Sequence, residues 1–172
     1  MRRRAVRGKC ESCNLDFRMQ RQMHSRWCWA AVATSIALFY DPRSKWTQCG
    51  VANRNLNVKN CCGKGVNGKC NKIGHLQDVL PLVRHAGEPA YVGKVRFNRA
   101  RQEIDAGRPL PVRTQWRDGE GAHFLAIVGY HREFELLTVA DPLFGTSHWH
   151  YKAFRDNYRH SGQWVNSYYT KP

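Results

Sequence analysis

The sequence predicts an α+β fold in which helices occupy the first part of the chain and an antiparallel sheet the second. Apolar residues recur at helical spacing in the first half, whereas the second half consists of short β-branched and aromatic segments separated by Gly, Asp or Pro. Hydrophobic residues make up 42% of the 172 residues, which is enough to bury the core of one domain. Because helices and strands are segregated, we expect a cleft where the two parts meet.

Each helix is predicted from its periodicity and its end signals. Residues 27–40 are apolar all round and stop at Asp41-Pro42, which is typical of a buried helix. Thr47 and Asn98 are expected to be N-caps, and Pro81 is expected to kink the helix that contains it. The predicted helices are residues 27–40, 47–56, 75–86 and 98–106.

The predicted strands form the second part of a single domain, and a basic arm precedes this domain. We expect residues 1–20 to be a flexible arm and residues 21–172 to form the domain, helical over 21–107 and β-sheet over 108–172. The predicted strands are residues 110–116, 123–130, 134–140, 148–151 and 164–170.

Charge is the most unusual bulk property of the chain. Its 28 Lys and Arg residues against 13 Asp and Glu residues give a formal net charge of +15. Such a field attracts nucleic acid, anionic lipid or acidic protein, and its sign alone does not choose among them. No run of about 18 apolar residues is present, so we expect no membrane span. No conventional secretory signal is visible either, because residues 10–14 interrupt the region that follows the basic start.

Seven cysteines leave two structural possibilities open. If one of them is a nucleophile, the other six can form disulfides in an oxidising compartment or bind zinc. A disulfide in the region 49–70 and a zinc site that uses the Cys10-x-x-Cys13 pair are both considered, although a second regular cysteine pair is missing. The cysteines are Cys10, Cys13, Cys28, Cys49, Cys61, Cys62 and Cys70.

Cys28 is the candidate nucleophile. It lies in the first turn of the predicted buried helix, where unpaired N–H groups and the helix dipole favour a negative charge. Gln22 precedes it by six residues and is placed to donate its side-chain amide to an oxyanion, together with the backbone N–H of Cys28. The structural alternatives are a small core cysteine and a solvated loop glutamine.

His123 and Asp141 complete the candidate site. His123 opens a wholly apolar strand after a glycine-rich turn, and Asp141 ends the following strand, so hairpin pairing brings the two together. The carboxylate would then orient the imidazole as in a Cys-His-Asp triad. The alternatives are a core histidine bonded to the backbone and an ordinary Asp-Pro turn.

These residues resemble the papain-like cysteine proteases, and more closely the bacterial avirulence-effector proteases of plant pathogens. The resemblance implies a papain-like fold, triad roles for Cys28, His123 and Asp141, and the oxyanion role for Gln22. It also implies delivery to a host or target cell and a possible activating host protein. The matching segments run from Gln22 to about Thr170: Gln22-x5-Cys28, 27–31 (WCWAA), 46–49 (WTQC), 61–62 (CC), 70–71 (CN), 107–109 (GRP), 123–130 (HFLAIVGY), Asp141-Pro142 with Gly145, and Gly162-x-Trp164.

The predicted function is therefore hydrolysis of peptide bonds in protein substrates through an acyl-enzyme, with no cofactor and no metal. One alternative keeps the triad in an amidase, deamidase or transglutaminase-like acyl transferase. A second alternative is a basic module that binds nucleic acid or an anionic surface, in which the cysteines are structural.

Overall fold

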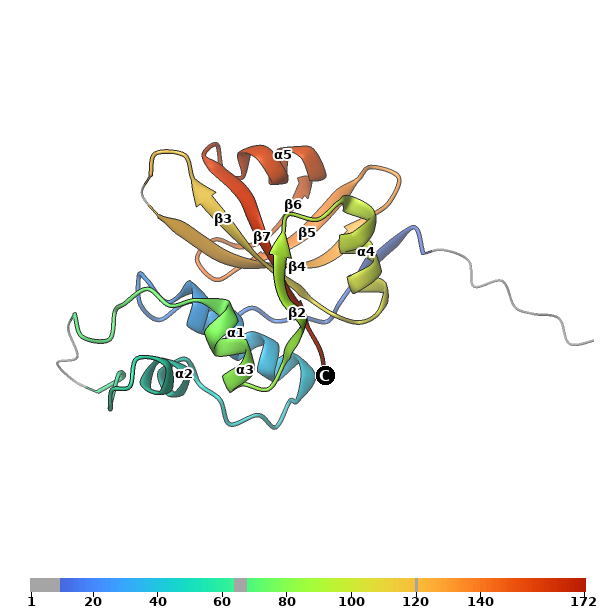
Figure 1. The fold of residues 1–172 in the computed structure, drawn as a ribbon. Coiled ribbons are helices and arrows are strands. Elements are labelled where there is room, and N and C mark those ends of the chain that lie inside the picture. Colours follow the sequence, from blue (N-terminus) through green and yellow to red (C-terminus); the bar gives the residue numbers. More distant parts are fainter. Residues whose placement is uncertain (1–9, 64–67, 120) are drawn as a thin grey trace, which may run out of the picture.

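The computed structural model describes residues 10–63, 68–119 and 121–172, in which five helices pack on a seven-stranded sheet (Figure 1). The strand order is β2-β7-β3-β4-β5-β6, every pair is antiparallel, and β1 also pairs with β4. This agrees with the predicted α+β class. The strands are β1 (Ser12–Asn14), β2 (Ala86–Gly93), β3 (Leu110–Trp116), β4 (Ala122–His131), β5 (Leu136–Asp141), β6 (Gly145–His150) and β7 (Gly162–Thr170).

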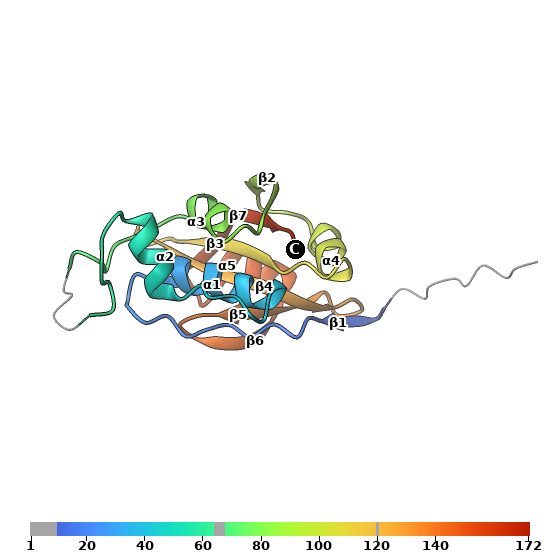
Figure 2. The same cartoon turned by 90° about the horizontal axis from the view of Figure 1, so that it is seen from below.

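The helices cover both faces of the sheet (Figures 1 and 2). Residues of α1, α2 and α3 form one core with Phe124 of β4, whereas residues of α4 and α5 form a second core with Leu125, the next residue of β4. This alternation follows from the two-residue period of a strand. The helices are α1 (Cys28–Tyr40), α2 (Gln48–Asn55), α3 (Leu76–Leu82), α4 (Phe97–Asp105) and α5 (Tyr151–Asn157).

The helix that carries the candidate nucleophile is the most deeply buried one. Every residue of α1 from Cys28 to Ala37 is buried, and the helix contains no charged residue. Asp41 leaves the helix in an extended conformation ahead of Pro42, as predicted. The predicted cap of α2 is also confirmed, because the Thr47 hydroxyl accepts a hydrogen bond from the backbone N–H of Gly50 at 3.1 Å.

Several elements differ from the prediction because tertiary pairing decides them. The third helix ends at Leu82, and the chain turns through Arg84, whose φ is 68°, into β2, an edge strand that the sequence did not predict. Asn98 lies inside α4, whose N-cap is Arg96, so that capping prediction was wrong. Strand β1 and helix α5 were also missed, both being short elements whose stability comes from their neighbours.

The predicted flexible arm of residues 1–20 does not match the structure from residue 12 onward. Strand β1 pairs with Gly129–His131 of β4, beyond Ile127, where the pairing of β4 with β3 ends. Phe17 and Met19 then pack against the core below the sheet. Unpaired strand edges and apolar side chains therefore hold this segment in place. The basic residues Arg2, Arg3, Arg4, Arg7 and Lys9 lie outside the described residues.

Two disulfides confirm the predicted cross-link in the region 49–70. They join Cys49 to Cys62 and Cys61 to Cys70, and so fasten the loop after α2 to that helix and to the segment before α3. Cys28 is a free thiol, as are Cys10 and Cys13. Within the described residues, no group of three or more His, Cys, Asp and Glu side chains is arranged to hold a metal ion. Likewise, no helix in these ranges has the length and apolar character needed to cross a bilayer.

Candidate active site

Cys28 is the first residue of α1, and its side chain is almost buried, with 8% of the residue exposed. The preceding residue, Trp27, provides no side-chain cap, and the first turn contains no acidic residue. The first N–H groups of the helix therefore have neither an intrahelical acceptor nor a capping carboxylate. Their positive potential favours an anion at the position of the Cys28 sulfur.

Two tryptophans fix the loop that runs beside the thiol. The indole N–H of Trp27 donates to the carbonyl of Cys70 at 2.7 Å, and that of Trp29 donates to the carbonyl of Lys72 at 3.1 Å. Gly74 lies so close to the Trp29 ring that a Cβ atom there would come within 2.6 Å of it. The Cys61–Cys70 disulfide anchors the same loop. Residues 70–74 therefore form a fixed wall next to the helix start.

The imidazole of His123 connects Cys28 to Asp141. Nε2 of His123 lies 2.9 Å from Oδ1 of Asp141, and the Cys28 side chain is near enough to the ring to raise the pKa of the imidazole. Because Nε2 is engaged by the carboxylate, Nδ1 is the nitrogen that faces the sulfur. The pairing of β4 with β5 places the two residues together, as the sequence predicted. Three predicted site residues thus lie together at the start of α1.

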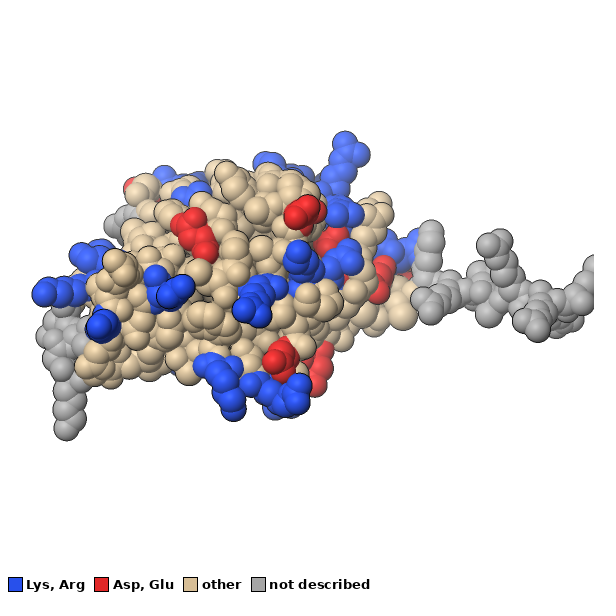
Figure 3. All heavy atoms as spheres, turned by 60° about the horizontal axis from the view of Figure 1, so that its bottom comes forward, with Lys and Arg blue, Asp and Glu red and all other residues tan. Residues whose placement is uncertain are grey.

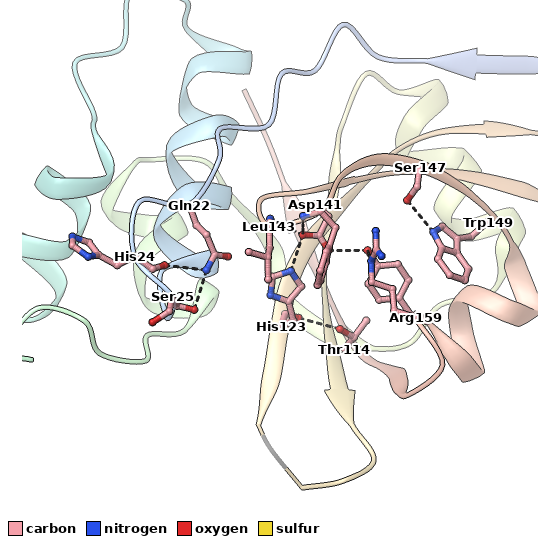
Figure 4. Close-up of polar contacts among 12 residues, drawn as sticks. Gln22, His24, Ser25, Thr114, His123, Asp141, Leu143, Ser147, Trp149 and Arg159 are labelled. Atoms are coloured by element: carbon pink, nitrogen blue, oxygen red, sulfur yellow. Dashed lines mark hydrogen bonds and ion pairs between the residues drawn. The ribbon is translucent and has the colours of Figure 1, made fainter.

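Besides the histidine, three groups donate hydrogen bonds to Asp141. Asp141 is 2% exposed, and its Oδ2 accepts a hydrogen bond from the Tyr158 hydroxyl at 2.7 Å. Its Oδ1 accepts from the backbone N–H of Leu143 at 2.7 Å (Figure 4) and from that of Phe144 at 3.0 Å. Burial alone would raise the pKa of the Asp141 carboxyl. Three partners outweigh burial and lower that pKa: His123, through its hydrogen bond and its charge, and Tyr158 and Leu143, through the hydrogen bonds that they donate. The carboxylate is therefore ionised at neutral pH.

The charged form of His123 is stabilised in turn. Burial lowers the pKa of the imidazole, but the hydrogen bonds and charges of Asp141 and Cys28 outweigh burial and raise it to about 9. Trp116 stacks beside the ring with a centroid separation of 6.2 Å, and Phe144 meets it edge-on at 6.2 Å. These aromatic rings limit the access of water to the imidazole. At neutral pH the imidazole of His123 is therefore charged beside the Cys28 side chain.

Gln22 does not present an amide hydrogen to the sulfur in this arrangement. Its Nε2 donates to the carbonyls of His24 and Ser25, each at 2.9 Å, which uses both amide hydrogens (Figure 4). Its Oε1 is buried without a hydrogen-bond partner in the described part of the chain. The backbone N–H of Gln22 donates to the carbonyl of Pro142 at 2.9 Å, which joins this loop to the turn that follows Asp141.

The sequence did not single out Tyr158, although it contacts Asp141 directly. Tyr158 follows α5 and is fully buried, and its position gives no motif because its partner lies 17 residues earlier in the chain. Two tryptophans lie near this carboxylate and its partners, and Trp116 stacks against His123. Trp149 packs instead against Tyr158, with ring centroids 5.0 Å apart.

Comparison with known proteins gives two findings. Residues 14–171 match the model of the Peptidase_C39 like family. A crystal structure described as that of a "putative C39-like peptidase from Bacillus anthracis" superposes with a TM-score of 0.62 at 15% sequence identity, over 95% of this chain and 99% of that one. At that identity the superposition shows a shared fold. No match was found among the curated proteins.

Proposed function

The chain belongs to the Peptidase_C39 like family, and on that basis we propose that it is a cysteine endopeptidase whose nucleophile is Cys28. The observation that carries the proposal is the arrangement of Cys28, His123 and Asp141 where the start of α1 favours an anion: His123 is hydrogen-bonded to Asp141, and Cys28 is near enough to raise the pKa of its ring. A buried core cysteine would need neither a charged imidazole nor a fully bonded carboxylate beside it.

The chemistry follows from this geometry. The Cys28 thiolate attacks the carbonyl carbon of the scissile peptide bond, and the electron pair of the C=O bond moves to the oxygen. The backbone N–H of Cys28 donates to that oxyanion. His123 gives its Nδ1 proton to the departing amine, leaving a thioester. Neutral His123 then takes a proton from water, the hydroxide attacks the thioester, and the carboxylic acid product leaves as the thiolate-imidazolium pair is restored.

We assign the second oxyanion donor to Gln22, after a rearrangement of its side chain. One amide hydrogen must leave the carbonyl of His24 or Ser25 and turn toward the oxyanion. The unpartnered Oε1 supports this assignment, because a buried acceptor without a donor makes the present position of the amide unfavourable.

An apolar surface beside the thiol supports a peptide with a large apolar side chain as substrate. Met23, Leu143 and Phe144 are 56%, 41% and 46% exposed. The hydrogen bond from Gln22 to Pro142 joins the two loops that carry them, and Phe144 contacts His123. Burying such side chains against a substrate residue would contribute about 25 cal/mol per Å² of apolar area.

A proteome digest tests the proposed reaction. The purified protein and its Cys28→Ala variant are incubated with a cell extract free of added reductant, and peptide termini are mapped by mass spectrometry. We expect new internal termini with the active protein alone, with large apolar residues enriched near the cleaved bond. Conversion of Gln to Glu, or new isopeptide bonds without new termini, would instead assign the site to a deamidase or an acyl transferase.

We also propose that the protein acts in an oxidising compartment, which the two disulfides favour because cytosolic thiols are usually kept reduced. The role of a bacterial effector in virulence, delivery to a host cell and activation by a host protein stay predictions from the sequence resemblance.

A further inference from the structure

A basic groove lies on the helical side of the molecule, and no residue of the candidate active site lines it. We use the name basic groove for the hollow of about 1110 Å³ between the loop after α1, the helix α2 with the loop that follows it, and the end of α3. This volume is slightly above the range for small-molecule sites, about 300–1,000 Å³. The cations that line it are Arg43, Lys45, Arg54, Lys59 and Arg84.

The charge of the groove is largely unneutralised. All five cations are exposed, and Asp41, the acidic residue of the lining, forms an ion pair with Arg43 at 3.8 Å. Lys45, Arg54, Lys59 and Arg84 have no side-chain hydrogen bond or ion pair with any residue of the ranges that the structure describes. Figure 3 shows Lys and Arg side chains spread over this side of the molecule, with Asp and Glu side chains among them. Such a concave array of one sign attracts an anionic partner.

The floor of the groove is apolar, which favours a protein segment over nucleic acid. Val58 and Leu82 are half-buried, and Pro81 is exposed beside them. Trp46 also contributes, but its ring packs against the core of α1–α3 and is not a free platform for a base. Single-stranded nucleic acid is bound mainly by cations and stacked aromatic rings, whereas a peptide with alternating acidic and apolar side chains fits a basic rim over an aliphatic floor.

We propose that the basic groove is a second binding site that captures an acidic segment of the protein substrate, at a distance from the bond that is cut. The proposal rests on the proposed peptidase function. The groove raises the affinity for substrates that carry acidic residues interspersed with Leu or Val outside the cleaved sequence. Two surfaces of the protein thereby determine which substrates are cut: the apolar surface at Cys28 selects the residue near the cleaved bond, and the basic groove selects substrates with a remote acidic segment.

Binding is measured without cleavage by using the full chain with Cys28→Ala. The probe is a fluorescent 12-residue peptide of alternating Glu and Leu, compared with the same peptide in which Gln replaces Glu and with a single-stranded DNA oligonucleotide. We expect the acidic peptide to bind at low salt and Arg54→Gln/Lys59→Gln/Arg84→Gln to weaken it by about 10-fold. A matched triple variant at exposed cations elsewhere, Lys94→Gln/Arg96→Gln/Arg132→Gln, should leave the affinity within about 2-fold.

Cleavage then tests the consequence. Two substrates with the same scissile sequence carry either the acidic peptide or its Gln counterpart as a tail. The acidic tail should raise kcat/KM about 10-fold in the active protein, and the groove variant should lose this gain while it keeps its rate on the Gln-tailed substrate. Equal binding of both peptides, or tighter binding of DNA lost in the same variant, would overturn the proposal. Tail-dependent binding without cleavage of any substrate would refute the peptidase function and leave the groove as a binding site for acidic peptides.

Discussion

Replacing Tyr158 by Phe removes the hydroxyl group that donates to Oδ2 of Asp141 at 2.7 Å and accepts a longer hydrogen bond from Nε of Arg159 at 3.4 Å. The other hydrogen bonds of the carboxylate, from His123, Leu143 and Phe144, all reach Oδ1. In Tyr158→Phe the Oδ2 atom of a residue that is 2% exposed therefore loses its donor. A hydrogen bond to a charged group is worth about 1.5–3 kcal/mol, so we expect the free energy of unfolding at pH 7 to fall by that amount.

The pH dependence of this loss identifies its cause. The folded-state pKa of Asp141 is lowered from the ordinary 3.8, so its carboxylate contributes stability above about pH 4, and that contribution is lost as pH falls through the folded value. Tyr158→Phe removes part of the lowering. The difference between the two proteins should therefore shrink as pH falls through the folded-state pKa of Asp141, toward the roughly 1 kcal/mol of a neutral hydrogen bond.

Guanidinium denaturation at pH 7 and at a series of pH values below 4 measures the loss of stability, and kcat/KM on a peptide substrate measures the loss of activity. We expect kcat/KM to fall about 10-fold, because a less constrained carboxylate orients His123 less well. Tyr151→Phe is the matched control, since the Tyr151 hydroxyl donates to the uncharged carbonyl of Val95 at 3.0 Å. It should cost about 1 kcal/mol at every pH value and leave kcat/KM unchanged. Equal losses in the two variants at pH 7, or a Tyr158→Phe loss that does not shrink at any acid pH at which the protein stays folded, would refute the reasoning.

Three further results are expected. The alkaline limb of kcat/KM against pH should lie near pH 9, because the raised pKa of His123 keeps the imidazole protonated at lower pH. Asp141→Asn should move this limb to lower pH by at least about one pH unit, worth about 1.4 kcal/mol, and a limb that stays in place would contradict the assignment. Replacing Cys61 and Cys70 together by Ser should lower the free energy of unfolding by about 2–3 kcal/mol in non-reducing denaturation, and an unchanged midpoint would argue against this disulfide. Leu143→Ser should lower kcat/KM about 10-fold for substrates with a large apolar side chain near the cleaved bond and leave kcat/KM unchanged for substrates with a small residue there. An equal drop for both kinds of substrate would exclude Leu143 as a specificity residue.

Local signals in the sequence were sufficient for the elements that bury a strongly patterned surface. The uniformly apolar stretch that became α1 and the β-branched segments of β3, β4 and β7 were predicted within a few residues of their observed ends. The contact between His123 and Asp141 also followed, because consecutive antiparallel strands place their adjoining ends together.

The missed features depend on residues far apart in the chain. Strand β1 forms because β3 leaves an edge of β4 unpaired, and nothing within residues 12–14 signals that vacancy. Tyr158 contacts Asp141 through the packing of α5 on the sheet. The position of the Gln22 amide was likewise decided by two neighbouring carbonyls whose direction depends on the fold of the loop. Such contacts are tertiary, and local propensity does not encode them.

The rate at which iodoacetamide alkylates Cys28 tests the central claim most directly. Alkylation of this residue is followed by mass spectrometry between pH 5 and pH 9 in the protein and in its His123→Ala variant. If the imidazolium stabilises a thiolate, alkylation of Cys28 at pH 6 should be at least about 10-fold faster in the unmodified protein than in the variant. Equal rates at pH 6, with reaction only at alkaline pH in both proteins, would contradict the account.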